Sequence, residues 1–440
     1  MTSALFSRRR AALAAALAFG LALAASMLLR HDDLPLPSGS VTGLRADPRP
    51  RGSTAEHIVR LQAAVRAAPE RADLRAGLAS AYLQRARETG DPGFYARADE
   101  LLRRAAARDP RSAQVATGRA SLALARHDFR GGLELARRAR SLAPGALAPY
   151  PAIVDALVEL GRYRAAEREL QAFVDAKPTL PAYARVSYLR ELRGDLDGAA
   201  AAMARAVSAG GGAPENVAHV QTLLGDLERA RGRTASAARA YAGALAALPG
   251  YVPAAAGRAR LAAQRGDLTS AIRRWRAIVA RRPLPEYAIA LGEAEQAAGR
   301  GVAARRDLAL VGAQQQLLRS AGVDVDLEFA LFEADHGSPE RALELARGAW
   351  ESAPSVRSAD ALGWALTRAG RPDEGLRWAR RALRLGSVDP LFRHHAGMAA
   401  LATGKAGEGR RQLRVALDHG LAAWPWHAAQ ARRALAGGAR

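Results

Sequence analysis

Apolar residues recur three and four positions apart through most of this chain, and short polar turns separate the runs. The stretch ALGWALTRAGRPDEGLRWARRAL, residues 361–383, shows two such amphipathic runs around a Gly-Arg-Pro turn. This spacing predicts a pair of antiparallel helices. Each predicted helix contains a glycine, Gly363 or Gly375, where alanine would favour the helix by about 1 kcal/mol. The two glycines lie twelve positions apart.

The same spacing of mostly small residues recurs along the chain. The pairs that lie twelve positions apart are Ala120/Gly132, Val154/Ala166, Ser187/Ala199, Gly225/Ala237, Ala259/Ala271, Gly292/Ala304, Ala330/Ala342, Gly363/Gly375 and Gly397/Gly409. Their first members are 33 to 38 residues apart, and a looser pair, Ala79 and Ala98, begins the series. Ten helix pairs are therefore predicted. Small side chains let the two helices of a pair cross closely, which offsets the lost helix propensity.

This pattern resembles the tetratricopeptide repeat (TPR), and the match covers about residues 70–424. Long arrays of this kind also occur in exported bacterial TPR proteins, which the chain resembles. The resemblance implies an all-α fold, a right-handed superhelical α-solenoid of about ten helix-turn-helix repeats. Each repeat then buries its apolar stripe on its neighbours. Two longer spacings, at 208–216 and 311–322, indicate loops that are either tolerated insertions or contacts for a partner.

The chain's ends differ from the array. Arg8, Arg9 and Arg10 precede an uncharged run at 11–29, which predicts a signal peptide or a signal-anchor helix over 1–29. Either outcome places the array outside the cytoplasm, on a cell-membrane anchor or in a secreted or periplasmic form. A Pro/Gly-rich linker is expected at 30–52, and a capping helix at 53–69, where Ser53 and Glu56 have capping-box spacing.

A second capping helix is expected at 425–440. Trp424 and Trp426 precede it, and we expect them to seal the open end of the stack, because a terminal repeat needs a cap.

Candidate binding residues follow from the resemblance, since the first helices of such repeats line a concave groove. Carried over by register, the residue after each small position faces this groove. The candidate partner-binding residues are Asp155, Tyr188, Asp226, Arg260, Glu293 and Trp364. Trp364 is either an exposed hot spot or a residue packed against a neighbouring first helix.

Charge is distributed unevenly between the two helices of each repeat. The formal net charge is +22, and nearly all the basic residues are arginine, as GC-rich coding would also produce. The inward positions of the first helices nevertheless hold ten acids: Asp73, Asp155, Glu159, Glu191, Asp226, Glu286, Glu293, Asp324, Asp335 and Asp360. The same positions hold only Arg229, Arg260, Arg357 and Arg368. An acidic groove would favour a basic peptide; alternatively, second helices simply expose more surface and collect arginine there.

The sequence contains no motif typical of catalysis or metal binding. The chain has no cysteine, and its histidines show neither an i, i+4 pair nor a His-Glu-x-x-His run. His394 and His395 are adjacent on one predicted helix, which points them about 100° apart, so a shared metal is not expected. We predict no enzymatic activity, no cofactor and no metal. The expected function is a protein–protein interaction scaffold; the alternative is a polyanion binder that uses its arginines on anionic lipid, cell-wall polymer or nucleic acid.

Overall fold

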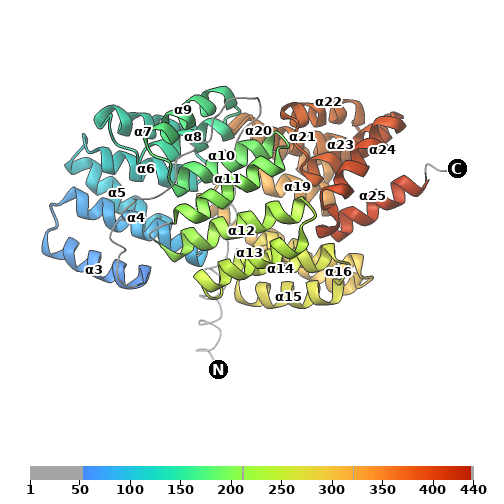
Figure 1. The fold of residues 1–440 in the computed structure, drawn as a ribbon, viewed down its shortest axis with the longest axis horizontal. Helices are drawn as coiled ribbons and strands as arrows, with labels where there is room; N and C mark the ends of the chain where they lie inside the picture. Colours follow the sequence, from blue (N-terminus) through green and yellow to red (C-terminus); the bar gives the residue numbers. More distant parts are fainter. Residues whose placement is uncertain (1–52, 211–212, 321, 438–440) are drawn as a thin grey trace.

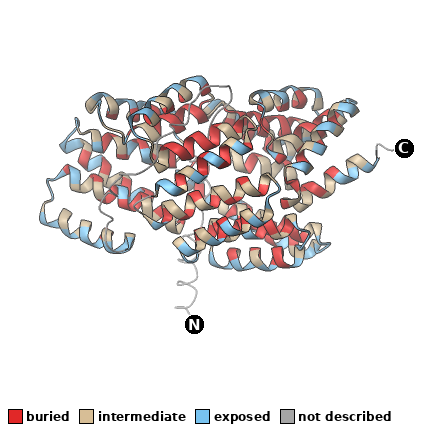
Figure 2. Ribbon diagram, in the orientation of Figure 1, coloured by how far each residue is buried: buried red, intermediate tan, exposed pale blue. Residues whose placement is uncertain are grey.

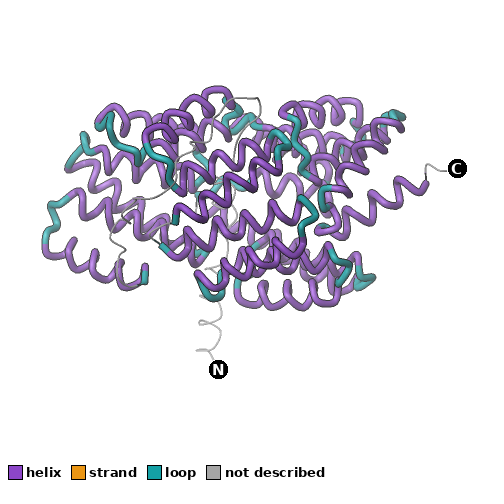
Figure 3. The backbone as a smooth tube through the Cα atoms, viewed as in Figure 1, coloured by secondary structure: helices purple, strands orange, loops and turns teal. Residues whose placement is uncertain are grey.

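Ten antiparallel helix pairs form the body of the molecule. The computed structural model describes residues 53–210, 213–320 and 322–437, and within these ranges all regular structure is helical (Figures 1 and 3). The pairs are α4 (Ala72–Thr89) with α5 (Gly93–Arg108), α6 (Ala113–Ala125) with α7 (Phe129–Leu142), α8 (Tyr150–Glu159) with α9 (Tyr163–Ala176), α10 (Leu180–Leu192) with α11 (Leu196–Ala209), α12 (Pro214–Ala230) with α13 (Thr234–Ala247), α14 (Val252–Gln264) with α15 (Leu268–Arg281), α16 (Pro285–Ala297) with α17 (Gly301–Leu308), α19 (Asp326–His336) with α20 (Pro339–Ser352), α21 (Val356–Arg368) with α22 (Pro372–Ala382), and α23 (Pro390–Ala402) with α24 (Ala406–Asp418). These pairs confirm the predicted repeat solenoid.

A few helices lie outside the pairs. They are α3 (Thr54–Ala67), α18 (Leu310–Ser320), α25 (Pro425–Gly437) and the short 3-10 turns η2 (Leu383–Leu385) and η3 (Leu421–Ala423). α3 begins with both hydrogen bonds of the capping box between Ser53 and Glu56, as the sequence predicts. The insertion expected as a loop at 311–322 instead contains α18. Its apolar residues Val311 and Leu318 are buried, so packing on the array favours a helix there.

Glycine makes the close helix crossing possible at Gly363 and Gly375. A Cβ on Gly363 would lie 2.9 Å from the Ala379 nitrogen and 3.0 Å from the Gly375 oxygen, and one on Gly375 would lie 2.7 Å from the Gly363 oxygen. Backbone cannot yield there as a flexible side chain can, so only glycine fits both positions. Buried residues follow the facing sides of the helices throughout (Figure 2), and most of them are alanine or leucine.

The superhelix winds far enough for its second turn to contact its first. The Tyr163 hydroxyl accepts a hydrogen bond from the Val356 backbone nitrogen at 2.8 Å, across 193 positions of sequence. His127 Nδ1 lies 2.5 Å from the carbonyl oxygen of Asp324, 197 positions away. Arg282 likewise donates to the carbonyl of Glu88. These contacts join helices from the first part of the array to helices from its second part.

The expectations for the N-terminus lie outside the described residues. The signal or anchor segment at 1–29 and the linker at 30–52 both belong to that part of the chain. Within the residues that the structure describes, no helix combines the length and the apolar character that crossing a membrane requires.

Candidate functional site: the lumen of the superhelix

The first helices of the repeats enclose three adjoining cavities, which we call the lumen. The central cavity, of about 400 Å³, is lined by residues of α10, α12, α14, α16, α19, α21 and α23, together with Trp424. A cavity of about 250 Å³ adjoins it on the side of α4, α6 and α8, and shares His219 and Pro253 with it. A third, of about 190 Å³, lies against α16, α19 and α25 and shares Arg260 and Glu286. Volumes of this size suit a small ligand or a few side chains.

Five of the six candidate residues line the lumen. The structure places Tyr188, Asp226 and Arg260 in the central cavity, Asp155 in the cavity near α8, and Glu293 in the cavity near α25. Asp226 accepts a hydrogen bond from the Tyr241 hydroxyl at 2.8 Å. Repeat register therefore places these side chains on the concave side, although Asp155, Tyr188 and Glu293 are buried there.

Trp364 corrects the expectation of an exposed hot spot. Its side chain is only 2% exposed, and its ring stacks on His395 with 4.6 Å between centroids. Its indole nitrogen donates to Asp335 Oδ1 at 2.9 Å. The alternative reading of the sequence holds instead, because Trp364 packs against the neighbouring helices α19 and α23.

The acids of the first helices face inward, as the register predicts. All ten except Asp73 line either the lumen or the pocket between the two superhelical turns. Asp73 lies on the outside, paired with Arg71. The second-helix arginines are mostly exposed, among them Arg103, Arg137, Arg305, Arg380 and Arg411. Charge is thus segregated between lumen and outer face.

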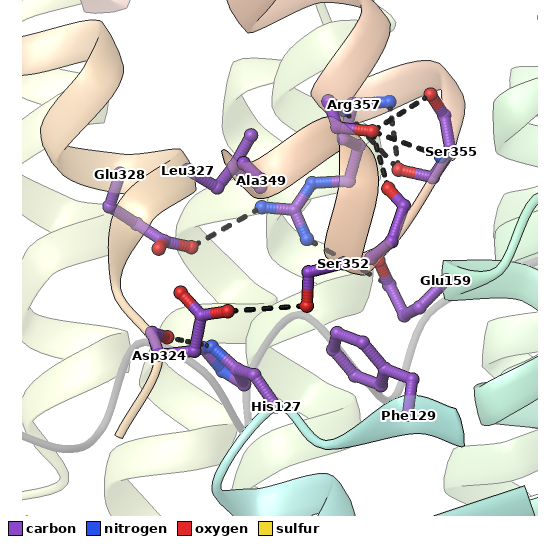
Figure 4. Close-up of a pocket in the computed structure, with 12 residues that line it drawn as sticks. His127, Phe129, Glu159, Asp324, Leu327, Glu328, Ala349, Ser352, Ser355 and Arg357 are labelled. Carbon is purple, nitrogen blue, oxygen red and sulfur yellow. Dashed lines mark hydrogen bonds and ion pairs between the residues drawn. The ribbon is translucent and has the colours of Figure 1, made fainter. Parts of the chain in front are cut away.

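Several inward carboxylates have an arginine partner. Asp155 accepts from Arg185 Nε at 2.7 Å, and a second contact joins the same two side chains. Arg357 lies between two glutamates in the pocket between the turns, 3.8 Å from both Glu159 and Glu328 (Figure 4). Burial raises the pKa of Asp155 and of Glu159, and the neighbouring arginine opposes the rise in each case.

Two glutamates of the central cavity have no such partner. Among the described residues, Glu191 and Glu286 form no ion pair, although both line the cavity. Burial, with repulsion from Asp389 and Asp226, raises the pKa of Glu191 to about 8. Burial likewise raises the pKa of Glu286 to about 8. Both carboxyls therefore hold protons at neutral pH unless a cation approaches them.

The C-terminal segment turns into the lumen. The ring of Trp424 lies 5.0 Å from the guanidinium carbon of Arg229 and 5.9 Å from that of Arg260. The ring of Trp426 lies 4.7 Å from that of His336. The two tryptophans expected to seal the open end of the stack thus contact helices of the middle of the array. Sequence register alone could not indicate this inward turn.

Histidines that the sequence analysis set aside also meet at this end. His394 and His395 of α23 are both buried, and His427 of α25 brings a third imidazole to them. Neither His394 nor His395 is on the surface, since both are at most 2% exposed. Repeat register held a signal, because His394 follows the inward Asp360 by 34 positions, the usual repeat length. His427 lies outside the repeats, so the repeat register could not predict its position.

Electrostatics differ sharply among these histidines. Burial lowers the pKa of His394 well below its usual value, and the neighbouring histidines His427 and His395 lower it further. Burial would also lower the pKa of His427, but the carboxylates of Glu293 and Asp335 outweigh it and leave that pKa raised. His427 is therefore the histidine of this group that the surroundings favour as a cation.

Comparison with known proteins gives structural neighbours only. No family model matches the sequence, and no curated protein matches it. The human IFIT1 dimer with PPP-AAAA shares 14% identity and a TM-score of 0.47, with 76% of this chain and 78% of that chain covered. The Cut9–Hcn1 hetero-tetramer of APC/C shares 17% identity and a TM-score of 0.36, covering 83% and 67%. A thermophilic TPR protein of Thermus thermophilus shares 24% identity and a TM-score of 0.34, covering 39% and 90%.

The helix pairs themselves define the class, a helical repeat solenoid. Its repeat is of the tetratricopeptide type, with small residues at each close crossing and ten pairs in register.

Proposed function

We propose that this chain is a non-catalytic scaffold that binds a protein or peptide partner by a cationic side chain inserted into its lumen. The observation that carries the proposal is the pair of unpartnered carboxyls, Glu191 and Glu286, in the central cavity. Ionised carboxylates in such a setting are unfavourable without a counter-charge. A lysine or arginine of the partner supplies that charge.

Cavity size sets what can enter. About 400 Å³ accommodates a few side chains or a chain terminus, but not a folded domain. Leu223 and Leu331 add apolar wall to the same cavity, which suits the aliphatic stem of a lysine or arginine. The partner therefore contributes a short extended segment or a terminus.

Proton release is a signature of this binding mode. Because the carboxyl pKa values stand at about 8, Glu191 and Glu286 are mostly protonated at pH 7 in the free protein. A bound cation lowers these pKa values and releases the protons. The binding enthalpy at pH 7 should therefore depend on the ionisation enthalpy of the buffer.

Fluorescent peptides with a central lysine, each matched by its acetyl-lysine counterpart, test the proposal by anisotropy. We expect the lysine peptides to bind at least tenfold more tightly than the acetylated ones, and Glu191→Gln/Glu286→Gln to remove about that factor. Glu408→Gln, on the outer face, is the matched control. Equal affinity for both peptide forms, or unchanged binding by the double variant, would contradict the proposal.

The alternative function uses the outer arginines on polyanions, and exposure of Arg103, Arg137 and Arg305 favours it. The dependence of binding on ionic strength distinguishes the two functions. Polyanion binding falls steeply between low and moderate ionic strength, whereas binding inside the lumen depends on salt much less. A photo-crosslinker at Leu223 would trap a lumen-bound partner directly in cells.

We also propose that the array works outside the cytoplasm, anchored in the cell membrane or released. The support is the sequence of Arg8 to Arg10 and the uncharged run behind them. A reporter that is active only in the cytoplasm, fused after Arg440, should be inactive. An active fusion would contradict this location.

A further inference from the structure

Three buried imidazoles meet at the C-terminal end of the lumen. His394 and His395 come from α23 and His427 from α25, and a ring nitrogen of each lies within 4.8 Å of those of the other two. The ring centroids of His394 and His427 are 5.2 Å apart, and those of His395 and His427 are 6.3 Å apart. All three side chains are at least nine-tenths buried.

Hydrogen bonds orient two of these rings from behind. His395 Nδ1 lies 2.8 Å from Asp360 Oδ2, and His427 Nε2 lies 3.1 Å from Asp335 Oδ2. Each carboxylate fixes the tautomer with the proton on the nitrogen next to it. The opposite nitrogens are His395 Nε2 and His427 Nδ1, and the neutral ring of either residue can donate a lone pair to a metal there.

Four ring nitrogens of this group have no hydrogen-bond partner. His395 Nε2, His427 Nδ1 and both ring nitrogens of His394 are buried without a hydrogen bond. Native proteins rarely leave several polar atoms of one cluster unsatisfied, and an ion is one explanation for such a cluster. Trp364, stacked on His395 and bonded to Asp335, holds the arrangement rigid.

We propose that His394, His395 and His427 form a binding site for a divalent transition metal, with zinc the best match. Neutral imidazole nitrogens are ligands that zinc prefers, and three of them leave one position of a tetrahedron open. Backing of each ligating histidine by a carboxylate is the usual outer shell of such sites. Glu293 lies beside this group, with Oε2 at 3.8 Å from His427 Nδ1.

Adjacency of His394 and His395 is no obstacle to a shared ion. Their rings lie 5.7 Å apart and are inclined at 68°, so the two side chains approach a common point from different directions. The third ligand comes from another element, which the sequence pattern on a single helix does not contain.

Such an ion fastens α25 to α23 and so closes one end of the lumen. Without metal, His427 instead lies between the carboxylates of Asp335 and Glu293. Metal binding exchanges this arrangement for coordination, and the histidine proton is released. The site does not use Glu191 or Glu286, although His395 also lines the central cavity.

Cobalt(II) titration of the full chain, stripped with chelator and followed by visible absorption, tests the proposal. We expect one equivalent to bind with the intense bands of a four-coordinate ion, and zinc to displace it. His394→Ala should abolish the signal, and Asp360→Asn should weaken binding about 10- to 100-fold, as loss of an outer-shell partner does. His57→Ala, distant on α3, should change nothing.

Two outcomes overturn the site. One is a parent chain that binds no cobalt(II), or binds it only with the weak bands of a hydrated ion. The other is unchanged binding in the His394→Ala variant. Hydrogen exchange on the parent chain alone provides a readout that needs no variant to fold: zinc should slow the exchange of α25 amides and leave those of α3 unchanged.

Discussion

Two arginine–carboxylate pairs of similar geometry lie in contrasting surroundings. On the outer face, Arg380 contacts Glu408 through two hydrogen bonds of 3.0 and 2.6 Å, with its side chain 50% exposed. In the lumen, Arg185 contacts Asp155 through two atoms as well, and both side chains are only 11% exposed. The pKa of Glu408 is lowered, chiefly by its hydrogen bond to Arg380, whereas burial raises that of Asp155 despite its arginine.

This contrast shows that the surroundings, more than the partner, decide the energetic role of a charge here. Outside, water screens the ion pair and each member can do without the other. Inside, each buried member depends on the other, since an unpaired charge in a poorly hydrated space is costly. Glu191 and Glu286 are the third case, inside and without a close ion pair. Arg229 and Arg260 only partly oppose the rise in their pKa values, and the protonated carboxyls are favoured.

The largest loss of stability is expected when the buried pair of Arg185 and Asp155 loses its arginine. Arg185→Met should lower the free energy of unfolding by about 3–5 kcal/mol, because Asp155 is left buried and unpaired. Denaturant unfolding followed by circular dichroism measures the loss. The double variant Arg185→Met/Asp155→Asn should recover much of it.

The matched control is the outer pair. Arg380→Met should cost about 0–1 kcal/mol, and added salt should shrink that cost further. Equal losses of unfolding free energy in Arg185→Met and Arg380→Met would contradict the distinction between lumen and outer face.

A smaller change in folding stability, which depends on pH, is expected from Glu191→Gln. The carboxyl pKa is about 8 in the folded chain against 4.5 for an ordinary glutamate, so the folded state binds more protons between these limits. Stability from this group is therefore greatest below about pH 4.5 and declines as pH rises to about 8. The variant should gain stability over the parent through this window, by roughly 1–2 kcal/mol above pH 8, allowing for partial solvent contact.

Melting temperatures of Glu191→Gln and parent at pH 5 and pH 9 measure this gain. Glu408→Gln should show the opposite sign, because the folded-state pKa of Glu408 is lowered and its carboxylate stabilises the fold at neutral pH. A pH-independent difference for Glu191→Gln would show that its carboxyl is ordinary.

The periodicity of the sequence was sufficient to predict those structural features that recur in every repeat. The crossing of Gly363 and Gly375, the helix pairs and the inward position of Asp226 all follow from a local register that neighbouring repeats copy. Features made by a single, non-repeating contact were out of reach. The meeting of His394 with His427 depends on how α25 turns back, and no spacing within a repeat encodes that turn.

Contact between the two superhelical turns changes how this array should fold. In an open solenoid every contact is local, so folding can begin anywhere and spread repeat by repeat. Here the bonds from Tyr163 to Val356 and from His127 to Asp324 join residues almost two hundred positions apart. Such distant pairings raise contact order and slow folding, but they also tie the first repeats to the last. Deleting one repeat from the middle would put every one of these partners out of phase, so the array should tolerate a change of length far less well than an open solenoid does.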